Sequence, residues 1–233
     1  MLDINKVRLF MLCIGHRGAM GYEPENTLRS IAKALELGVD AVEIDVYNVA
    51  GQLIVIHDRD ISRTTNGEGY IENCSFAYLR SLDAGKGERI PTLQEVIDRV
   101  DRRAKINIEL KGNNTAKLAV VVVLDYIKQG WSYNDFIISS FNHYELDLVK
   151  AIDPNLITGM LIYGLPLDYI EIAQKLSADI VIGGLDYVDA KLVDLVHRKN
   201  LQVWVYTVNR PQDIITMREL GVDGIFTNYP DLV

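Results

Sequence analysis

The stretch that most constrains the fold of this chain covers residues 41–58, AVEIDVYNVAGQLIVIHD. It begins as an apolar strand that two acids, Glu43 and Asp45, interrupt at a spacing of two. Because side chains alternate faces along a strand, both carboxylates point the same way, and they repel each other unless a cation lies between them. A second apolar run at 53–56 then leads into His57. Paired acids followed by an imidazole indicate a hydrolytic site, for which the rest of the chain supplies the scaffold.

The composition fits one globular domain and excludes several classes of protein. The chain has 233 residues, of which 48% are hydrophobic, enough for a full core. A net charge of −8 argues against a nucleic-acid or anionic-membrane partner. The two cysteines, Cys13 and Cys74, stand in unrelated contexts, so we expect no disulfide framework or zinc site, and a cytoplasmic location. No apolar run approaches the ~18 residues of a membrane span, so we expect no stable membrane insertion.

The amino terminus faintly resembles a signal peptide, because Lys6 and Arg8 precede the apolar run 9–14. That run is too short and continues into a glycine-containing motif without a small-residue cleavage site. We therefore interpret residues 1–10 as an extension and 11–233 as a single domain. Residues 59–91 are rich in small and polar side chains, and we expect them to form a small irregular insertion.

Short apolar runs alternate with amphipathic segments along the remaining chain. The runs expected to form strands are 11–15, 40–46, 53–56, 105–110, 135–140, 156–162, 179–182, 201–207 and 223–226. The segments expected to form helices are 25–37, 92–100, 114–129, 143–152, 167–176, 190–199 and 211–220. This alternation predicts an α/β fold, a closed parallel (β/α)₈ TIM barrel. An open doubly wound sheet, the alternative, would usually carry a Gly-rich phosphate turn, and the sequence contains none.

Chemically unusual residues follow the first strands of this barrel, where catalytic groups gather. His16 and Arg17 follow the first strand, and the run 105–110 places Glu109 and Lys111 on one face at its end. Together with the paired acids above, Glu109 makes a set of three carboxylates that suits a hard divalent cation, Ca²⁺ or Mg²⁺. Arg17 and Lys111 would neutralise a phosphoryl group, and two histidines can divide the proton transfers. The sequence therefore predicts metal-assisted cleavage of a phosphate ester.

Nine short motifs occur along the chain in a fixed order. They are GHRG (15–18), PENT (24–27), EID (43–45), IHD (56–58), RTTNG (63–67), IPTL (90–93), ELK (109–111), SSF (139–141) and GVDG (221–224). In this order they resemble the glycerophosphodiester phosphodiesterase family, from about residue 12 to the end. The resemblance implies a TIM-type barrel that hydrolyses glycerophosphodiesters to sn-glycerol 3-phosphate and an alcohol with the help of one divalent cation.

The resemblance also implies a role for individual residues. The matching positions are Glu43, Asp45 and Glu109 as metal ligands, His16 and His57 as the acid/base pair, Arg17 and Lys111 as phosphate contacts, and Phe141 as an aromatic at the mouth. The chain departs from the family pattern at Tyr206, Asn228 and Val49, where Trp, Asp and Thr are usual. These differences leave the expected reaction intact and leave the alcohol part of the substrate open. Tyr206 shares a strand face with Trp204 and lies nearer the mouth, so we expect Tyr206 to contact substrate and Trp204 to fill the core.

Several interpretations remain open at this stage. The sequence does not assign base and acid between His16 and His57, and we expect Asp58 to orient His57 rather than to bind metal. An alternative enzyme would act on lysophospholipids or other lipid head groups in the manner of a phospholipase D, and would carry a secretion signal, disulfides or an exposed apolar rim. A non-catalytic barrel would have lost a histidine or a ligand, and this chain keeps them all. We expect a small-molecule glycerophosphodiester substrate; a homodimer is left open, and Arg63 is assigned no role.

Overall fold

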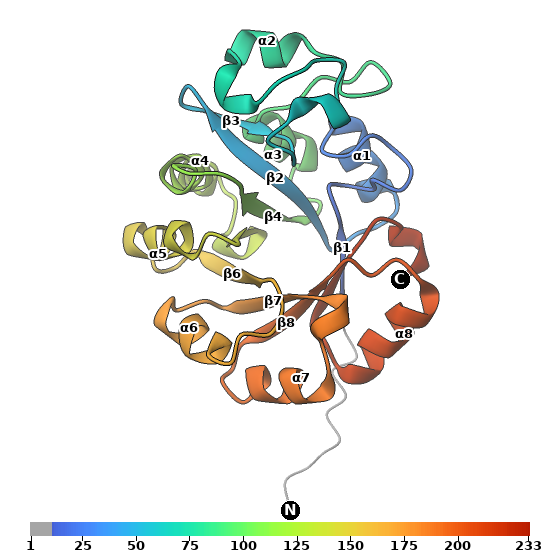
Figure 1. Ribbon diagram of the computed structural model, residues 1–233, viewed down its shortest axis with the longest axis vertical. Helices are drawn as coiled ribbons and strands as arrows, with labels where there is room; N and C mark the ends of the chain where they lie inside the picture. Colours follow the sequence, from blue (N-terminus) through green and yellow to red (C-terminus); the bar gives the residue numbers. More distant parts are fainter. Residues whose placement is uncertain (1–10) are drawn as a thin grey trace, which may run out of the picture.

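The computed structural model describes residues 11–233, so the predicted extension at 1–10 lies outside the described residues. Parallel strands form the centre of the molecule and helices surround it (Figure 1). These strands are β1 (Leu12–Gly15), β2 (Ala41–Val49), β4 (Lys105–Leu110), β5 (Phe136–Ser140), β6 (Ile157–Ile162), β7 (Ile180–Gly184), β8 (Gln202–Tyr206) and β9 (Gly224–Thr227). Strand β1 pairs in parallel with both β2 and β9, which closes the sheet. The predicted TIM barrel is therefore confirmed, with one additional strand, β3 (Gln52–Val55).

The helices cover the outside of the barrel (Figure 1). They are α1 (Leu28–Glu36), α3 (Leu93–Val100), α4 (Ala116–Lys128), α5 (His143–Ile152), α6 (Tyr169–Lys175), α7 (Ala190–His197) and α8 (Pro211–Leu220), whereas α2 (Phe76–Ser81) lies in the insertion beside β3. Helix α4 contains the run of four valines, whose β-branched side chains favour a strand locally. It forms a helix because Val120 and Val123 lie on one face and are buried, whereas Val121 on the opposite face is exposed. Packing of this face against the barrel outweighs the local preference.

Side chains at the helix starts fix where two of the predicted helices begin. Thr27 accepts a hydrogen bond from the backbone of Ser30 at the start of α1. Thr92 and Glu95 form a capping box at the start of α3, each accepting a hydrogen bond from the other's backbone N–H. Such caps satisfy donors that have no partner within the helix. Both helices therefore begin a residue or more later than the predicted ranges, which included the capping residues.

The second strand of the barrel is longer than predicted and forms a hairpin. β2 extends to Val49 and turns at Ala50 and Gly51, both at positive φ, before β3 returns antiparallel to it.

The insertion at 59–91 was expected to be irregular, but it contains α2 and short 3₁₀ turns. It also has its own apolar cluster, Val49, Ile54, Ile56, Ile61, Ile71, Leu79, Leu82, Ala84 and Ile90. This cluster holds the insertion against the hairpin that leads to His57. The division of the chain into an extension and one domain stays a prediction.

Apolar side chains fill the interior of the barrel below its mouth. They are Ile14, Ala41, Ile137, Leu161, Ile180, Ile182, Trp204 and Phe226. Trp204 is 2% exposed and packs edge to face on Phe226, which agrees with its predicted place in the core. The carboxyl ends of the strands are therefore closed from below by an apolar layer. In residues 11–233, no helix combines the length and apolar character that crossing a membrane requires.

Candidate active site

The turn after β1 places His16 and Arg17 at the mouth of the barrel. Arg17 adopts a positive φ of 50° and Gly18 one of 84°. A Cβ at Gly18 would lie 2.4 Å from the hydroxyl of Ser30, so only glycine fits there. The turn directs the backbone N–H of Arg17 to Glu43, where it donates a 2.8 Å hydrogen bond to Oε2. The GHRG motif is thus tied directly to the acids of β2.

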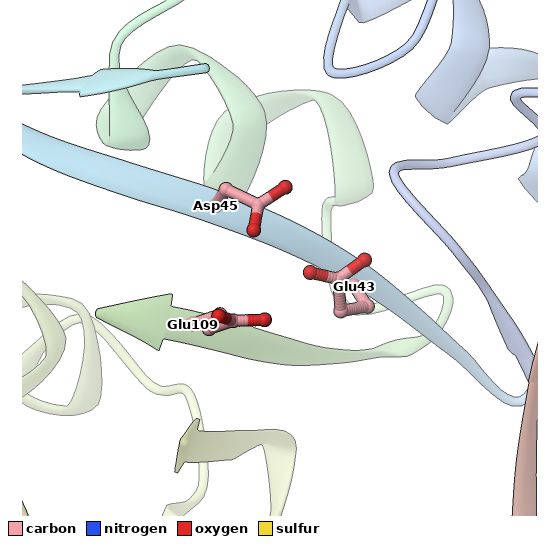
Figure 2. Close-up of side chains that lie close together, drawn as sticks. All are labelled: Glu43, Asp45 and Glu109. Atoms are coloured by element: carbon pink, nitrogen blue, oxygen red, sulfur yellow. The ribbon is translucent and has the colours of Figure 1, made fainter. Parts of the chain in front are cut away.

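Three acids from two neighbouring strands converge beside this turn. Glu43 and Asp45 lie on β2, and Glu109 lies directly opposite Asp45 on β4. One carboxylate oxygen from each lies within 4.8 Å of the other two, and Figure 2 shows their side chains lying close together. Glu43 and Asp45 are buried. The predicted period-two spacing therefore brings together the acids that the sequence assigned to a metal.

The electrostatics of these acids fit a bound cation. Burial, with Asp45 and Glu109 close by, raises the pKa of Glu43 well above its usual range, and burial with Asp45 raises the pKa of Glu109 to about 7. Asp45 Oδ1 is buried and accepts no hydrogen bond from the described residues. A buried carboxylate oxygen without a donor is costly unless a positive charge faces it. Oxygen donors of this kind suit Ca²⁺ or Mg²⁺.

Two cationic side chains flank the acids. Arg17 Nε lies 3.5 Å from Asp45 Oδ2. Lys111 Nζ lies 2.7 Å from Glu109 and 3.6 Å from Asp45 Oδ1. Burial disfavours the charge of Lys111, but Glu109 and Asp45 raise its pKa above the usual value. Both cations stay charged and stand where they can meet a substrate phosphate.

His16 is held by a residue from the far end of the chain. Its Nδ1 lies 2.8 Å from Oδ1 of Asn228, so Nδ1 carries the proton and Nε2 keeps a lone pair. Burial and the adjacent Arg17 lower the pKa of His16 to about 4. His16 is therefore a neutral imidazole near pH 7, the form that accepts a proton.

His57 stands at the end of an ion-pair network. Its Nδ1 donates to Asp58 at 2.5 Å, and its Nε2 accepts from Lys111 at 3.2 Å. Arg63 forms an ion pair with Asp58, which lowers the pKa of the Asp58 carboxyl to about 2. Arg63 also donates two hydrogen bonds of 2.8 Å to Glu25. Asp58 thus contacts His57 as expected and lies outside the acid cluster.

The predicted site residues other than Asp45 line one cavity of about 140 Å³. Its lining is His16, Arg17, Glu43, His57, Asn107, Glu109, Lys111, Ser139, Phe141, Leu161, Tyr206, Thr207 and Phe226. The predicted substrate residues Phe141 and Tyr206 lie in this lining and pack edge to face at 5.9 Å. The structure therefore brings every sequence-predicted site residue to one mouth.

Sequence reasoning missed three asparagines of the site. Asn26 donates to Asp45 Oδ2 at 2.9 Å, Asn107 faces the cavity beside Glu43, and Asn228 holds His16. Asn107 precedes Glu109 by two residues, so the same period-two rule would have placed it on the cavity face. No local signal connects Asn228 with His16, because 212 residues separate them.

A parallel barrel whose mouth combines three acids suited to a cation, two imidazoles and two fixed cations defines the class of barrel phosphodiesterases. Residues 16–232 match the family model described as the glycerophosphoryl diester phosphodiesterase family. The chain belongs to that family.

Individual relatives agree with this assignment over nearly the whole chain. A glycerophosphodiester phosphodiesterase of Caldanaerobacter subterraneus subsp. tengcongensis is 35% identical, covering 94% of this chain and 95% of the relative. A glycerophosphodiester phosphodiesterase of Bacillus subtilis is 32% identical, covering 95% of this chain and 85% of the relative. This fold is similar to the solved structure of an Oleispira antarctica phosphodiesterase in complex with the product sn-glycerol-3-phosphate. The TM-score is 0.88 and the identity 30%, and the match covers 96% of this chain and 95% of that one.

Proposed function

We propose that this chain hydrolyses glycerophosphodiesters to sn-glycerol 3-phosphate and an alcohol with the help of one divalent cation, Ca²⁺ or Mg²⁺. The observation that carries the proposal is the convergence of Glu43, Asp45 and Glu109, in which a buried Asp45 oxygen accepts no hydrogen bond from the described residues, next to the cavity that His16 and His57 share. The relatives named as glycerophosphodiester phosphodiesterases support the same reaction. The choice between the two ions, a cytoplasmic location and a homodimer remain predictions.

Glu43, Asp45 and Glu109 would hold the ion. When bound, it supplies Lewis-acid polarisation of a phosphoryl oxygen. Arg17 and Lys111 bind the remaining phosphoryl oxygens and stabilise the charge that develops on them in the transition state. Phe141 and Tyr206 form the uncharged wall against which the substrate is positioned.

The two histidines divide the proton transfers. His16 has a free Nε2 lone pair and a low pKa, so it suits the role of the group that takes a proton from the nucleophile, a water or the glycerol 2-hydroxyl. The Asp58 carboxylate accepts from Nδ1 of His57 and fixes the orientation of its ring, with Nε2 toward Lys111. With His16 as the base, His57 takes the other role and protonates the leaving alkoxide.

The test is a substrate panel with the purified protein. Glycerophosphocholine, glycerophosphoethanolamine and glycerophosphoglycerol are incubated with Ca²⁺, Mg²⁺, Mn²⁺ or chelator, and released glycerol 3-phosphate is measured. We expect turnover only with a divalent cation. Full activity in chelator would contradict the metal assignment. Lysophosphatidylcholine is included because faster cleavage of this lipid than of all three diesters would favour the lipid-directed alternative.

A further inference from the structure

The mouth of the barrel has two chemically different sides. Within the described residues, each charged or imidazole side chain of the cavity lining comes from β2, β4 or the segments that follow β1, β3 and β4. The opposite side, at the ends of β5 to β9, is uncharged. It consists of Ser139, Phe141, Leu161, Tyr206, Thr207 and Phe226. The phosphate chemistry is therefore confined to one half, and the other half is free to contact another part of a substrate.

Tyr206 is locked into this uncharged side. Its hydroxyl donates a 2.9 Å hydrogen bond to the carbonyl of Ile162, so the side chain reaches from β8 across β7 to the end of β6. Gly184 lies opposite Tyr206 in the β7–β8 register. A Cβ at Gly184 would lie 3.8 Å from the Tyr206 ring, so the ring rests against the glycine. Phe141 meets the ring at an interplanar angle of 87°.

Two further tyrosines extend this surface outward from the cavity. Tyr187 packs on the same glycine, with its Cδ2 3.4 Å from the position of a Cβ at Gly184. The ring of Tyr163 lies 6.3 Å from that of Tyr187. Tyr163 is 84% exposed and Tyr187 39%. We call Phe141, Tyr163, Tyr187 and Tyr206 the aromatic wall.

The arrangement of the lining places part of the substrate on this wall. The phosphoryl group is expected beside the acids, imidazoles and cations of the cavity of about 140 Å³. The second alcohol of a diester then projects away from these charges, toward the uncharged side. The aromatic wall is the uncharged surface that continues from the cavity lining through Phe141 and Tyr206.

We propose that the aromatic wall binds the alcohol part of the substrate and selects a quaternary ammonium alcohol of the choline type. The proposal rests on the function proposed above and names the substrate class of the same site. A quaternary ammonium donates no hydrogen bonds, carries apolar methyl groups and is attracted to the negative faces of aromatic rings. A primary ammonium or a polyol needs hydrogen-bonding partners instead, and the Tyr206 hydroxyl beside the cavity is already bonded to the carbonyl of Ile162.

The experiment compares four diesters with the wild-type protein and saturating divalent cation. They are glycerophosphocholine, its uncharged isostere with a 3,3-dimethylbutyl alcohol, glycerophosphoethanolamine and glycerophosphoglycerol. We expect kcat/KM for the choline diester to exceed that for the isostere by roughly tenfold, with the difference in KM. Equal values for these two would overturn the proposal, because the wall would then recognise shape alone.

Substitutions identify the residues responsible. The double variant Tyr163→Leu with Tyr187→Leu is expected to lose roughly tenfold in kcat/KM for the choline diester and to keep the wild-type value for glycerophosphoglycerol. Tyr144→Leu is the matched control, because Tyr144 is 87% exposed at the start of α5 and contributes nothing to the wall. An equal loss on all four substrates would contradict the proposal. If the wild type releases no glycerol 3-phosphate from any diester, the proposed function itself fails, and that result differs from a loss of selectivity.

Discussion

Binding of a divalent cation should stabilise the folded protein because only the folded chain brings Glu43, Asp45 and Glu109 together. Two unit negative charges within 4.8 Å of each other repel by at least about 3.5 kcal/mol at an effective dielectric constant of about 20, which adds to burial in raising the pKa of Glu43 in the absence of an ion. An ion present at about 100 times its Kd adds about 2.7 kcal/mol to the free energy of unfolding. For a chain of this size, that energy raises Tm by about 5–10 °C.

Glu43→Gln separates this effect from general damage to the fold. The pKa of Glu43 lies well above its usual range without a metal, so glutamine resembles the protonated acid, and we expect the variant to unfold in chelator near the wild-type Tm. It should lose most of the shift that Ca²⁺, Mg²⁺ or Mn²⁺ produces, as measured by differential scanning calorimetry. Glu68→Gln, which changes an exposed acid, should keep the full shift. A wild type that no ion stabilises, or a Glu43→Gln variant with an undiminished shift, would refute the reasoning.

Four further predictions follow from the site and its supports. His16→Ala and His57→Ala should each lower kcat by roughly 10²–10⁴-fold and leave the metal-induced shift in Tm intact. Because the folded pKa of His16 is about 4, only the unfolded chain binds its proton between about pH 6.5 and 4. The contribution of His16 to stability should therefore fall by about 3 kcal/mol as pH drops through this window, so in denaturant titrations the wild type should lose about that much more stability than His16→Gln between these pH values. Arg63→Ala should lower kcat, and added guanidinium should partly restore it because Arg63 is 49% exposed. The control Arg59→Ala removes an exposed ion pair of the same insertion and should leave kcat unchanged. Thr92→Ala should cost about 1 kcal/mol of stability through loss of the α3 cap and leave kcat/KM unchanged.

The parts of the site that the sequence predicted depend on local periodicity. Glu43 and Asp45 share a face because a strand repeats every two residues, and Glu109 with Lys111 follows the same rule on β4. The end of β1 is also a local feature, so His16 could be placed at the mouth once the barrel was predicted. These residues required only the order of the strands and the rule that active sites lie at their carboxyl ends.

The remaining parts depend on closure of the barrel, which no local pattern encodes. Asn228 reaches His16 only because β9 pairs with β1. Arg63 reaches Asp58 and Glu25 because the insertion folds back over the hairpin through its own apolar cluster. Tyr187 joins the aromatic wall because a glycine ends β7 opposite Tyr206. Each contact joins segments whose separation in the sequence hides their proximity in space.

The most direct test of the central claim is a crystal structure of the protein with Mn²⁺ and sn-glycerol 3-phosphate, with the ion located by anomalous scattering. We predict one ion bound by Glu43, Asp45 and Glu109, with the phosphate between His16 and His57. An ion bound outside these three acids, or a phosphate out of reach of both imidazoles, would contradict the assignment of the site.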